Sequence, residues 1–209
     1  YSIKSIKLGN GLLDREYSYF PNGQIKAITN VGTYDYDQLN SLTKANNDSY
    51  SYDNVSNRMS NNENGKTIDY IISPKSNRLI AKKTGLFTTD YEYDAAGNII
   101  KDGTMSYTYD VVGRLSKVIN DNNDNNKELA SYQYNAFSQR IQKDVNGAKT
   151  IFIYNSAGQL LEEQNKQQNT IRDYVYVDGQ LIAAIENGII SYITTDHLNA
   201  PQIITSQTG

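Results

Sequence analysis

The 209-residue chain has no cysteine and no tryptophan, and it has only three prolines. The absence of cysteine excludes disulfides and thiolate metal sites, although many exported proteins also lack cysteine, so no compartment follows. There is no apolar run of about 18 residues and no basic segment followed by an apolar one at the N-terminus. We therefore expect no membrane span and no signal peptide within this segment.

Charge of a single sign is also lacking. The 20 Lys+Arg and 23 Asp+Glu give a net charge of -3, and neither sign forms a long block. Nucleic acids and anionic membranes attract proteins with basic patches, so we expect neither as a partner. The chain begins at Tyr1 and ends at Gly209 just after an apolar run, which we interpret as a piece of a longer polypeptide.

Tyrosine is the residue in excess, with 18 Tyr against 4 Phe in a chain that is only 38% hydrophobic. One unit of the form YxYDxxGxL recurs along the chain, most clearly at 91–99 (YEYDAAGNI) and 107–115 (YTYDVVGRL). The frame also fits 17–25, 34–42, 50–58, 132–140, 152–160 and, shortened, 174–181, with degenerate copies opened by Tyr70 and Tyr192. The second tyrosines, which we assign as structural repeat residues, are Tyr19, Tyr36, Tyr52, Tyr93, Tyr109, Tyr134, Tyr154 and Tyr176.

The unit predicts a β-hairpin. Two tyrosines at i and i+2 lie on one face of a strand, and the D-x-x-G that follows is typical of a tight turn, in which Asp caps and Gly takes a positive φ. The clearest turn positions are Asp94, Gly97, Asp110 and Gly113, with Asp178 and Gly179 forming a two-residue turn in the shortened copy. Ser56 and Ser138 stand at the turn glycine in two copies, where a positive φ is strained.

A three-residue loop places the residue six positions after the second tyrosine opposite it. This predicts cross-strand pairs such as Tyr93/Ile99 and Tyr109/Leu115, each worth about 0.2–1 kcal/mol. In the shortened copy the partner is five positions on, at Leu181. Arg58 and Arg140 occupy this position in two copies, where each is expected to lie along a tyrosine ring.

The remaining sequence adds no other element. No segment shows a sustained period of 3.6 residues, so the chain is expected to be all-β. The polar stretches 61–66 and 121–127 are interpreted as solvent-exposed loops. The tyrosines are expected to stack into ladders along the sheet.

The repeat resembles the YD repeat of the Rhs family, which includes bacterial Rhs polymorphic toxins, the C subunits of insecticidal toxin complexes and the extracellular teneurins. The C-terminal residues 174–183 (YVYVDGQLIA) and 192–201 (YITTDHLNAP) are similar to the Rhs-repeat-associated core signature, with Asp196, His197 and Pro201 as its conspicuous residues. Asn199 stands where the family usually has Gly. The resemblance implies a hairpin array over 1–173 and a core signature over 174–209, continuous with the same shell.

In that family the hairpins join edge to edge into a spiralling, hollow β-shell, which in the toxin members encloses a C-terminal effector. The resemblance therefore implies a structural shell segment of a secreted bacterial toxin rather than an enzyme. Its implied partners are the rest of the same polypeptide, the effector, and a secretion-apparatus or toxin-complex subunit. The alternative is an extracellular adhesion or carbohydrate-binding module.

Residues with chemical potential are few. His197 beside Asp196 suggests acid–base work, but there is no second histidine for a metal site and no nucleophile at a recognisable spacing, so a structural turn is favoured. The aspartyl autoprotease of many family toxins uses paired D-P-x-G motifs, and this sequence has no Asp-Pro. The repeat aspartates supply one carboxylate per copy, which favours turn capping over a calcium ladder. We expect no catalytic residue, metal or cofactor.

Overall fold

The computed structural model describes residues 3–8, 13–122, 126–196 and 198–206. Two compact units divide the chain, Tyr1–Gly103 and Thr104–Gly209. In the first unit the strands are β1 Ser5–Leu8, β2 Leu13–Tyr19, β3 Ile25–Ile28, β4 Gly32–Tyr36, β5 Leu42–Ala45, β6 Asp48–Tyr52, β7 Arg58–Glu63, β8 Lys66–Ile72, β9 Leu79–Thr84, β10 Phe87–Tyr93 and β11 Ile99–Asp102. In the second they are β12 Met105–Tyr109, β13 Leu115–Asn120, β14 Lys127–Tyr134, β15 Arg140–Val145, β16 Ala148–Tyr154, β17 Leu160–Asn165, β18 Thr170–Val177, β19 Gln180–Glu186, β20 Ile189–Thr195 and β21 Pro201–Thr205.

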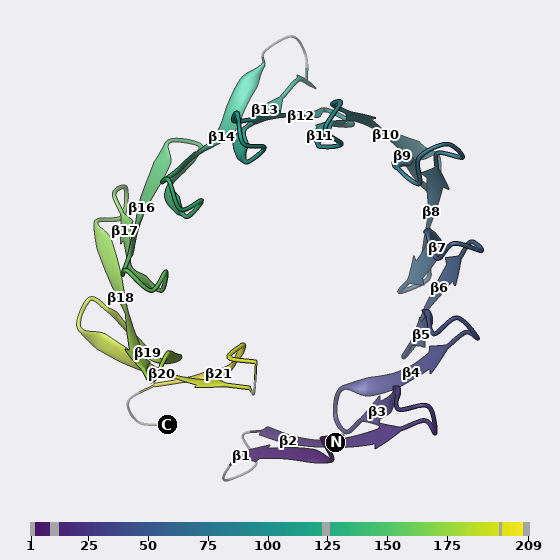
Figure 1. Ribbon diagram of the computed structural model, residues 1–209, viewed down its shortest axis with the longest axis horizontal. Helices are drawn as coiled ribbons and strands as arrows, with labels where there is room; N and C mark the ends of the chain where they lie inside the picture. The colour runs from purple at the N-terminus through teal and green to yellow at the C-terminus, as the bar shows by residue number, and fades with distance from the viewer. Residues whose placement is uncertain (1–2, 9–12, 123–125, 197, 207–209) are drawn as a thin grey trace. The chain divides into compact units, whose positions relative to one another are not determined.

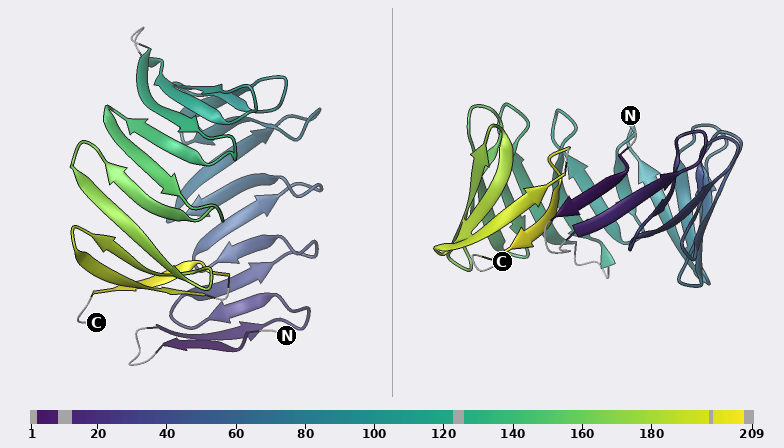
Figure 2. Two further views of the ribbon diagram at one scale, coloured as in Figure 1. Left: turned by 60° about the vertical axis from the view of Figure 1, so that its left-hand side comes forward. Right: turned by 90° about the horizontal axis from the view of Figure 1, so that it is seen from below.

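Within each unit every strand pairs antiparallel with the next strand in sequence. Figures 1 and 2 show the described strands of each unit as a single row of hairpins. The prediction of an all-β chain of tandem hairpins is confirmed.

The repeat hairpins have the predicted register. Tyr93 pairs with Ile99 and Tyr109 with Leu115, each across a β-bulge. The shortened copy pairs Tyr176 with Leu181, five positions on. The deletion of one turn residue therefore leaves the pairing of the tyrosine intact. The same pairing holds for Tyr19/Ile25, Tyr36/Leu42, Tyr52/Arg58, Tyr134/Arg140 and Tyr154/Leu160.

Two kinds of turn alternate along the chain. The D-x-x-G turns, here called repeat turns, close one end of the sheet in each unit. The turns that lead from one repeat hairpin to the next, here called return turns, close the other end because consecutive turns of a meander alternate between its two ends. Several return turns are two-residue Asn-Gly turns with both φ values positive, such as Asn64 (52°) with Gly65 (76°) and Asn146 (51°) with Gly147 (86°). Such type I′ turns suit the twist of a hairpin.

The prediction that 61–66 is an exposed loop is wrong. Residues 61–63 complete β7, Asn64 and Gly65 form a return turn, and Lys66 begins β8. Asn61 is only 3% exposed, and its side chain accepts a hydrogen bond from the Tyr70 hydroxyl (3.0 Å) and donates one to Glu63 (2.7 Å). An asparagine-rich run therefore continues the sheet, because its buried amide is satisfied by neighbouring side chains. Of the stretch 121–127, residues 123–125 lie outside the described residues.

The sheet of each unit has two faces. The tyrosine face carries the paired tyrosines, which are half-buried, and the opposite side is here called the back face. The accessible surface of the chain is 14198 Å², whereas a compact protein of this mass exposes about 9,800 Å². Among the described residues the buried apolar side chains are Ala81, Ala130, Phe152 and Ala183. The excess of surface follows from the single layer, which leaves both faces open.

Candidate functional site: the repeat turns and the tyrosine face

Each repeat turn is a compact hydrogen-bonded loop built on its Asp or Asn. In the turn of β10 and β11, the Asp94 amide donates to the Asn98 carbonyl (3.0 Å) and the Gly97 amide donates to the Asp94 carbonyl (3.1 Å). The Asp94 carboxylate accepts the Asn98 amide (2.8 Å) through Oδ1. The side chain thus takes up a backbone donor that the turn leaves without a strand partner, which is the ordinary role of an Asx turn.

The same bonds recur in the other copies. Oδ1 of Asp110 accepts the amides of Val112 and Arg114 (3.0 Å each), and Oδ1 of Asn135 accepts those of Phe137 and Gln139 (3.0 Å each). Equivalent bonds are made by Asp37, Asp53 and Asn155. Because an uncharged amide caps as an aspartate does, the geometry matches turn capping at each of these positions.

Hydrogen bonding to the charged form lowers the pKa of three of these carboxyls. For Asp53 and Asp94 the main cause is the side-chain amide of Asn57 and Asn98, respectively. For Asp110 it is the backbone amide of Arg114, with the guanidinium as a further cause. All three carboxyls are thereby held in the ionised form to lower pH than usual.

Positive φ values occur where the repeat places them. Gly97 (94°) and Gly113 (82°) lie in the left-handed region, and Asp178 (50°) and Gly179 (81°) form the two-residue turn. Ser56 (65°) and Ser138 (62°) adopt the same conformation despite their side chains. Gly97 meets a second constraint, since a Cβ there would lie 3.2 Å from the Arg78 guanidinium.

The second tyrosines join neighbouring repeat hairpins. The boundary between two such hairpins, near their repeat turns, is here called a seam. The β9–β10 ladder ends at Ala81 and Asp90, so the strands have no further paired residues toward the repeat turns. There the Tyr93 hydroxyl donates to the Leu79 carbonyl (2.7 Å), the first residue after the preceding repeat turn. The tyrosine thus satisfies a carbonyl that the ladder leaves open.

Three other seams follow the same rule. The hydroxyls of Tyr52, Tyr134 and Tyr154 donate to the carbonyls of Leu42 (2.8 Å), Leu115 (2.9 Å) and Arg140 (3.1 Å). Tyr19 makes the corresponding bond to the Ile3 carbonyl (2.6 Å). Phenylalanine has the same ring but no donor, which explains why the repeat uses tyrosine at this position.

Arginine lies over several of the aromatic rings. Arg58 lies 4.8 Å from the ring centre of Tyr50 and 5.9 Å from that of Tyr52, and Arg114 lies 4.7 Å from Tyr134. Arg140 lies over Tyr132 (5.7 Å) and Phe152 (4.9 Å) rather than over its cross-strand partner Tyr134. Tyr17 and Tyr19 stack within one strand, and Phe20 meets Tyr36 edge-on, while the tyrosine ladder along the sheet stays a prediction.

Two of the second tyrosines, Tyr36 and Tyr176, have a shifted pKa. Burial raises the pKa of both, and for Tyr36 the neighbouring Tyr34 contributes further. Burial disfavours the phenolate, so both hydroxyls stay protonated to higher pH than usual.

Tyr192, interpreted as the opening of a degenerate copy, lies one residue out of frame. Thr195 pairs with Pro201 and so takes the position of the second tyrosine.

The core signature contains one more repeat turn. The amide of Asp196 donates to the Ala200 carbonyl (2.9 Å), and its carboxylate accepts the amides of Leu198 and Ala200 (2.9 Å each). Asn199 has a φ of 60°, as a turn glycine would. His197 lies outside the described residues. Among the described residues no group of three His, Cys, Asp or Glu is placed to hold a metal ion.

One functional position escaped the sequence reasoning, namely the residue directly after the turn glycine. Asn98 donates through Nδ2 to Asp94 (2.9 Å), and Arg114 donates through Nε to Asp110 (2.7 Å). Where the turn residue is Asn, the partner is Gln: Asn155 donates to Gln159 Oε1 (2.8 Å), whose Nε2 then donates to the Gly179 carbonyl (3.3 Å). The signal was present as a pairing of Asp with Asn or Arg, and of Asn with Gln, four residues apart.

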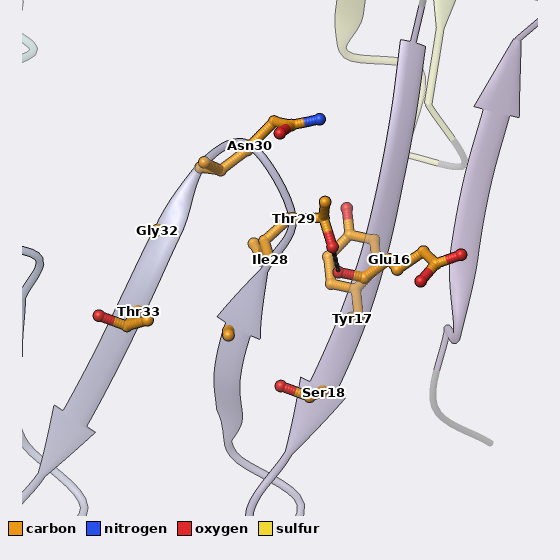
Figure 3. Close-up of a pocket in the computed structure, with 10 residues that line it drawn as sticks. Glu16, Tyr17, Ser18, Ile28, Thr29, Asn30, Gly32 and Thr33 are labelled. Carbon is orange, nitrogen blue, oxygen red and sulfur yellow. Dashed lines mark hydrogen bonds between the residues drawn. The ribbon is translucent and has the colours of Figure 1, made fainter. Parts of the chain in front are cut away.

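A pocket of about 600 Å³ lies beside the return turn of β3 and β4. Figure 3 shows its wall, in which Thr29 Oγ1 donates to the Glu16 carbonyl (3.4 Å). Its titratable lining groups are Glu16 and Tyr17, and the Glu16 side chain is 63% exposed. The pocket brings together no acid–base pair, so we assign it no chemistry.

The fold defines a class of protein, the single-layer β-hairpin repeat. The described residues contain no helix of the length and apolar character needed to cross a membrane. A family model described as "Teneurin YD-shell" matches residues 26–209. The chain therefore belongs to this YD-shell family, in agreement with the resemblance to the Rhs and YD repeats.

Relatives and solved structures are consistent with this. The chain is 37% identical over 98 residues to the tRNA3(Ser)-specific nuclease WapA of Bacillus spizizenii, and 36% identical over 87 residues to the tRNA nuclease WapA of Bacillus subtilis. These matches cover 46% and 41% of this chain but 4% of each relative. Crystal structures described as TcdB2-TccC3 and TcdB2-TccC3-Cdc42 have TM-scores of 0.55 and 0.53 at 14% and 12% identity, covering 94% and 92% of this chain and 15% and 14% of theirs. They share the fold.

Proposed function

We propose that residues 1–209 are a wall segment of an Rhs-type toxin that encloses a C-terminal effector made in the same polypeptide. The observation that carries this proposal is the single layer of hairpins whose seams are closed by tyrosine hydroxyls, such as Tyr93 on the Leu79 carbonyl (2.7 Å). A sheet that stays joined through its seams separates the space on its two sides. Membership of the YD-shell family supports this role for the sheet.

The work of such a wall is steric. A protease needs an extended, accessible segment of its substrate, and a wall without gaps withholds the effector from it. The wall must also resist local opening, and the repeat turns contribute to this because their Asp or Asn side chains fix the loop backbone. In this proposal the segment has no catalytic role and needs no cofactor.

The partners in this proposal are the remainder of the polypeptide, the effector and a toxin-complex or secretion subunit, and the parent protein acts outside the producing cell. Support comes from the fold shared with TcdB2-TccC3. The nuclease activity in the names of the WapA relatives belongs to those proteins, of which this chain matches 4%.

The division into an array (1–173) and a core signature (174–209) is part of the same proposal. β18 (Thr170–Val177) runs across residue 174, so the boundary marks a change of sequence motif within one strand. In this proposal Asp196, His197 and Pro201 have a structural role: Asp196 caps the turn between β20 and β21, and Pro201 pairs with Thr195.

Limited proteolysis of the full-length parent tests enclosure. The effector is expected to resist digestion inside the intact parent and to be cut rapidly when it is expressed alone. A matched variant carrying Tyr93→Phe and Tyr154→Phe, which removes two seam bonds, is expected to shorten the protection. An effector digested equally fast in both settings would overturn the proposal.

A further inference from the structure

The back face is polar along most of the chain. Cross-strand partners lie on one face of a sheet, so the register links Ser51, Ser60, Asp69, Lys83 and Thr88 into one row across β6 to β10. A second row links Thr108, Lys117, Ser131, Asp144 and Lys149 across β12 to β16. This composition is that of a sheet face in contact with water.

The back face becomes apolar toward the last hairpins. The register links Ile153, Glu162, Asp173, Ile185 and Ile190 into one row across β16 to β20. Val175 and Tyr192 lie two residues along from Asp173 and Ile190, and Ile171 lies two residues before Asp173, so all three share this face. We call Ile153, Ile171, Val175, Ile185, Ile190 and Tyr192 the apolar back patch.

The patch is partly exposed. Tyr192 is 51% exposed, Ile171 48% and Ile153 40%. The tyrosine face of the same strands is mixed, because the row that begins at Phe152 continues through Glu163, Arg172 and Glu186. An antiparallel sheet face in contact with water is ordinarily polar, so exposed apolar side chains gathered on one face mark an interaction site.

Two carboxylates lie in the middle of the patch. Glu162 and Asp173 are direct cross-strand partners, and like charges in that position repel each other. Glu162 accepts a hydrogen bond from Gln164, and the ion pairs within the described residues include neither carboxylate. A basic side chain placed between them would relieve the repulsion, which defines the charge of the missing partner.

We propose that the apolar back patch binds a segment of the same parent polypeptide outside residues 1–209, which presents apolar side chains and one Lys or Arg between Glu162 and Asp173. This inference rests on the proposed function, in which the chain is part of a longer protein. The matched relatives are long enough to supply such a segment, since the chain covers only 4% of each. An intramolecular partner also has a high effective concentration, so a small patch suffices to bind it.

Thiol labelling of the parent polypeptide tests the contact, because residues 1–209 contain no cysteine. Single variants Tyr192→Cys and Ile171→Cys report on the patch, and Ser51→Cys on the polar back face serves as the matched control. Each rate of maleimide labelling is compared with that of the same variant unfolded in urea, and the parent without the added cysteine gives the background. We expect at least a tenfold protection at positions 192 and 171, and little at 51.

Equal labelling at all three positions would overturn the proposal, as would equal protection at all three, because the patch would then have no special cover. Protection that disappears on dilution would identify a second copy of the chain as the partner, which also overturns it. Because two positions report independently, a single variant that fails to fold does not decide the result.

A charge variant tests the cation. Asp173→Lys in the Tyr192→Cys parent is expected to raise the labelling rate several-fold, whereas Asp69→Lys, placed in the polar row, is expected to leave it unchanged. An unchanged rate with Asp173→Lys would remove the cation from the proposal. If the effector resists proteolysis while positions 192 and 171 label freely, the docking inference fails and the enclosure function stands. If positions 192 and 171 are protected while the effector is digested as fast inside the parent as alone, the enclosure function fails and the docking inference stands.

Discussion

The back faces of two regions differ although their tyrosine faces are alike. Across β6 to β10 the back face runs through Ser60, Asp69 and Lys83, whereas across β16 to β20 it runs through Ile153, Ile185 and Ile190. The repeat motif fixes the tyrosines and the turn, so it leaves the back face free to vary. Under the docking proposal, this freedom lets the back face match what each region contacts, which is water for the polar row and a partner segment for the apolar back patch.

A charge on the back face should separate the two regions most strongly. Ile185→Asp is expected to lower the free energy of unfolding by about 2 kcal/mol, because it removes a half-buried aliphatic group and adds a third carboxylate beside Asp173. Thr88→Asp, placed in the polar row opposite Lys83, is expected to change it by less than about 0.5 kcal/mol. Urea titration of both variants measures the difference, and equal losses would contradict the distinction between the regions.

Loss of a seam hydrogen bond should lower the free energy of unfolding by the same amount in both regions. Tyr93→Phe and Tyr154→Phe each remove a hydroxyl donor from a backbone carbonyl, and each is expected to destabilise by about 1 kcal/mol. Tyr192→Phe, at an exposed position on the back face, is the control and is expected to have little effect. A loss confined to one region would show that the seams are not equivalent.

Replacing the serine at a strained turn position with glycine should stabilise the fold. Ser56 has a φ of 65°, and its turn lies in the region with the polar back face. Ser56→Gly removes the side-chain penalty of the left-handed conformation and is expected to stabilise by about 0.5–1 kcal/mol. Ser138→Gly (φ 62°) should match it, and a destabilising result for both in thermal melts would show that the hydroxyls have another role.

Acid should loosen the turns of one region before those of the other. The pKa of Asp94 is lowered in the folded chain by Asn98, so its stabilising effect is present above the unfolded pKa of about 3.9 and is lost as the pH falls through the folded value. The turn at Asn155 has no such group. Amide exchange is expected to show protection at Asn98 falling below about pH 4, with no change at Gln159, and Asp94→Asn should abolish the fall.

Much of the fold follows from the sequence because the repeat is local. The pairing of Tyr93 with Ile99 depends only on the five residues between them, 94–98, so the spacing of the turn determines it. The strand position of Asn61 depended instead on Tyr70 and Glu63, which a local pattern does not connect. The seam bonds join residues such as Tyr134 and Leu115 from different repeats, and composition alone does not reveal which carbonyl is left open.

The seams also bear on how such a chain lengthens in evolution. The Tyr134 hydroxyl recognises only a backbone carbonyl, that of Leu115, and every residue type offers the same acceptor. A duplicated hairpin inserted at a seam therefore finds its attachment ready, whatever side chains its neighbour carries. The array can gain or lose whole units while the copies drift apart in sequence, provided that each keeps one phenol and one tight reversal.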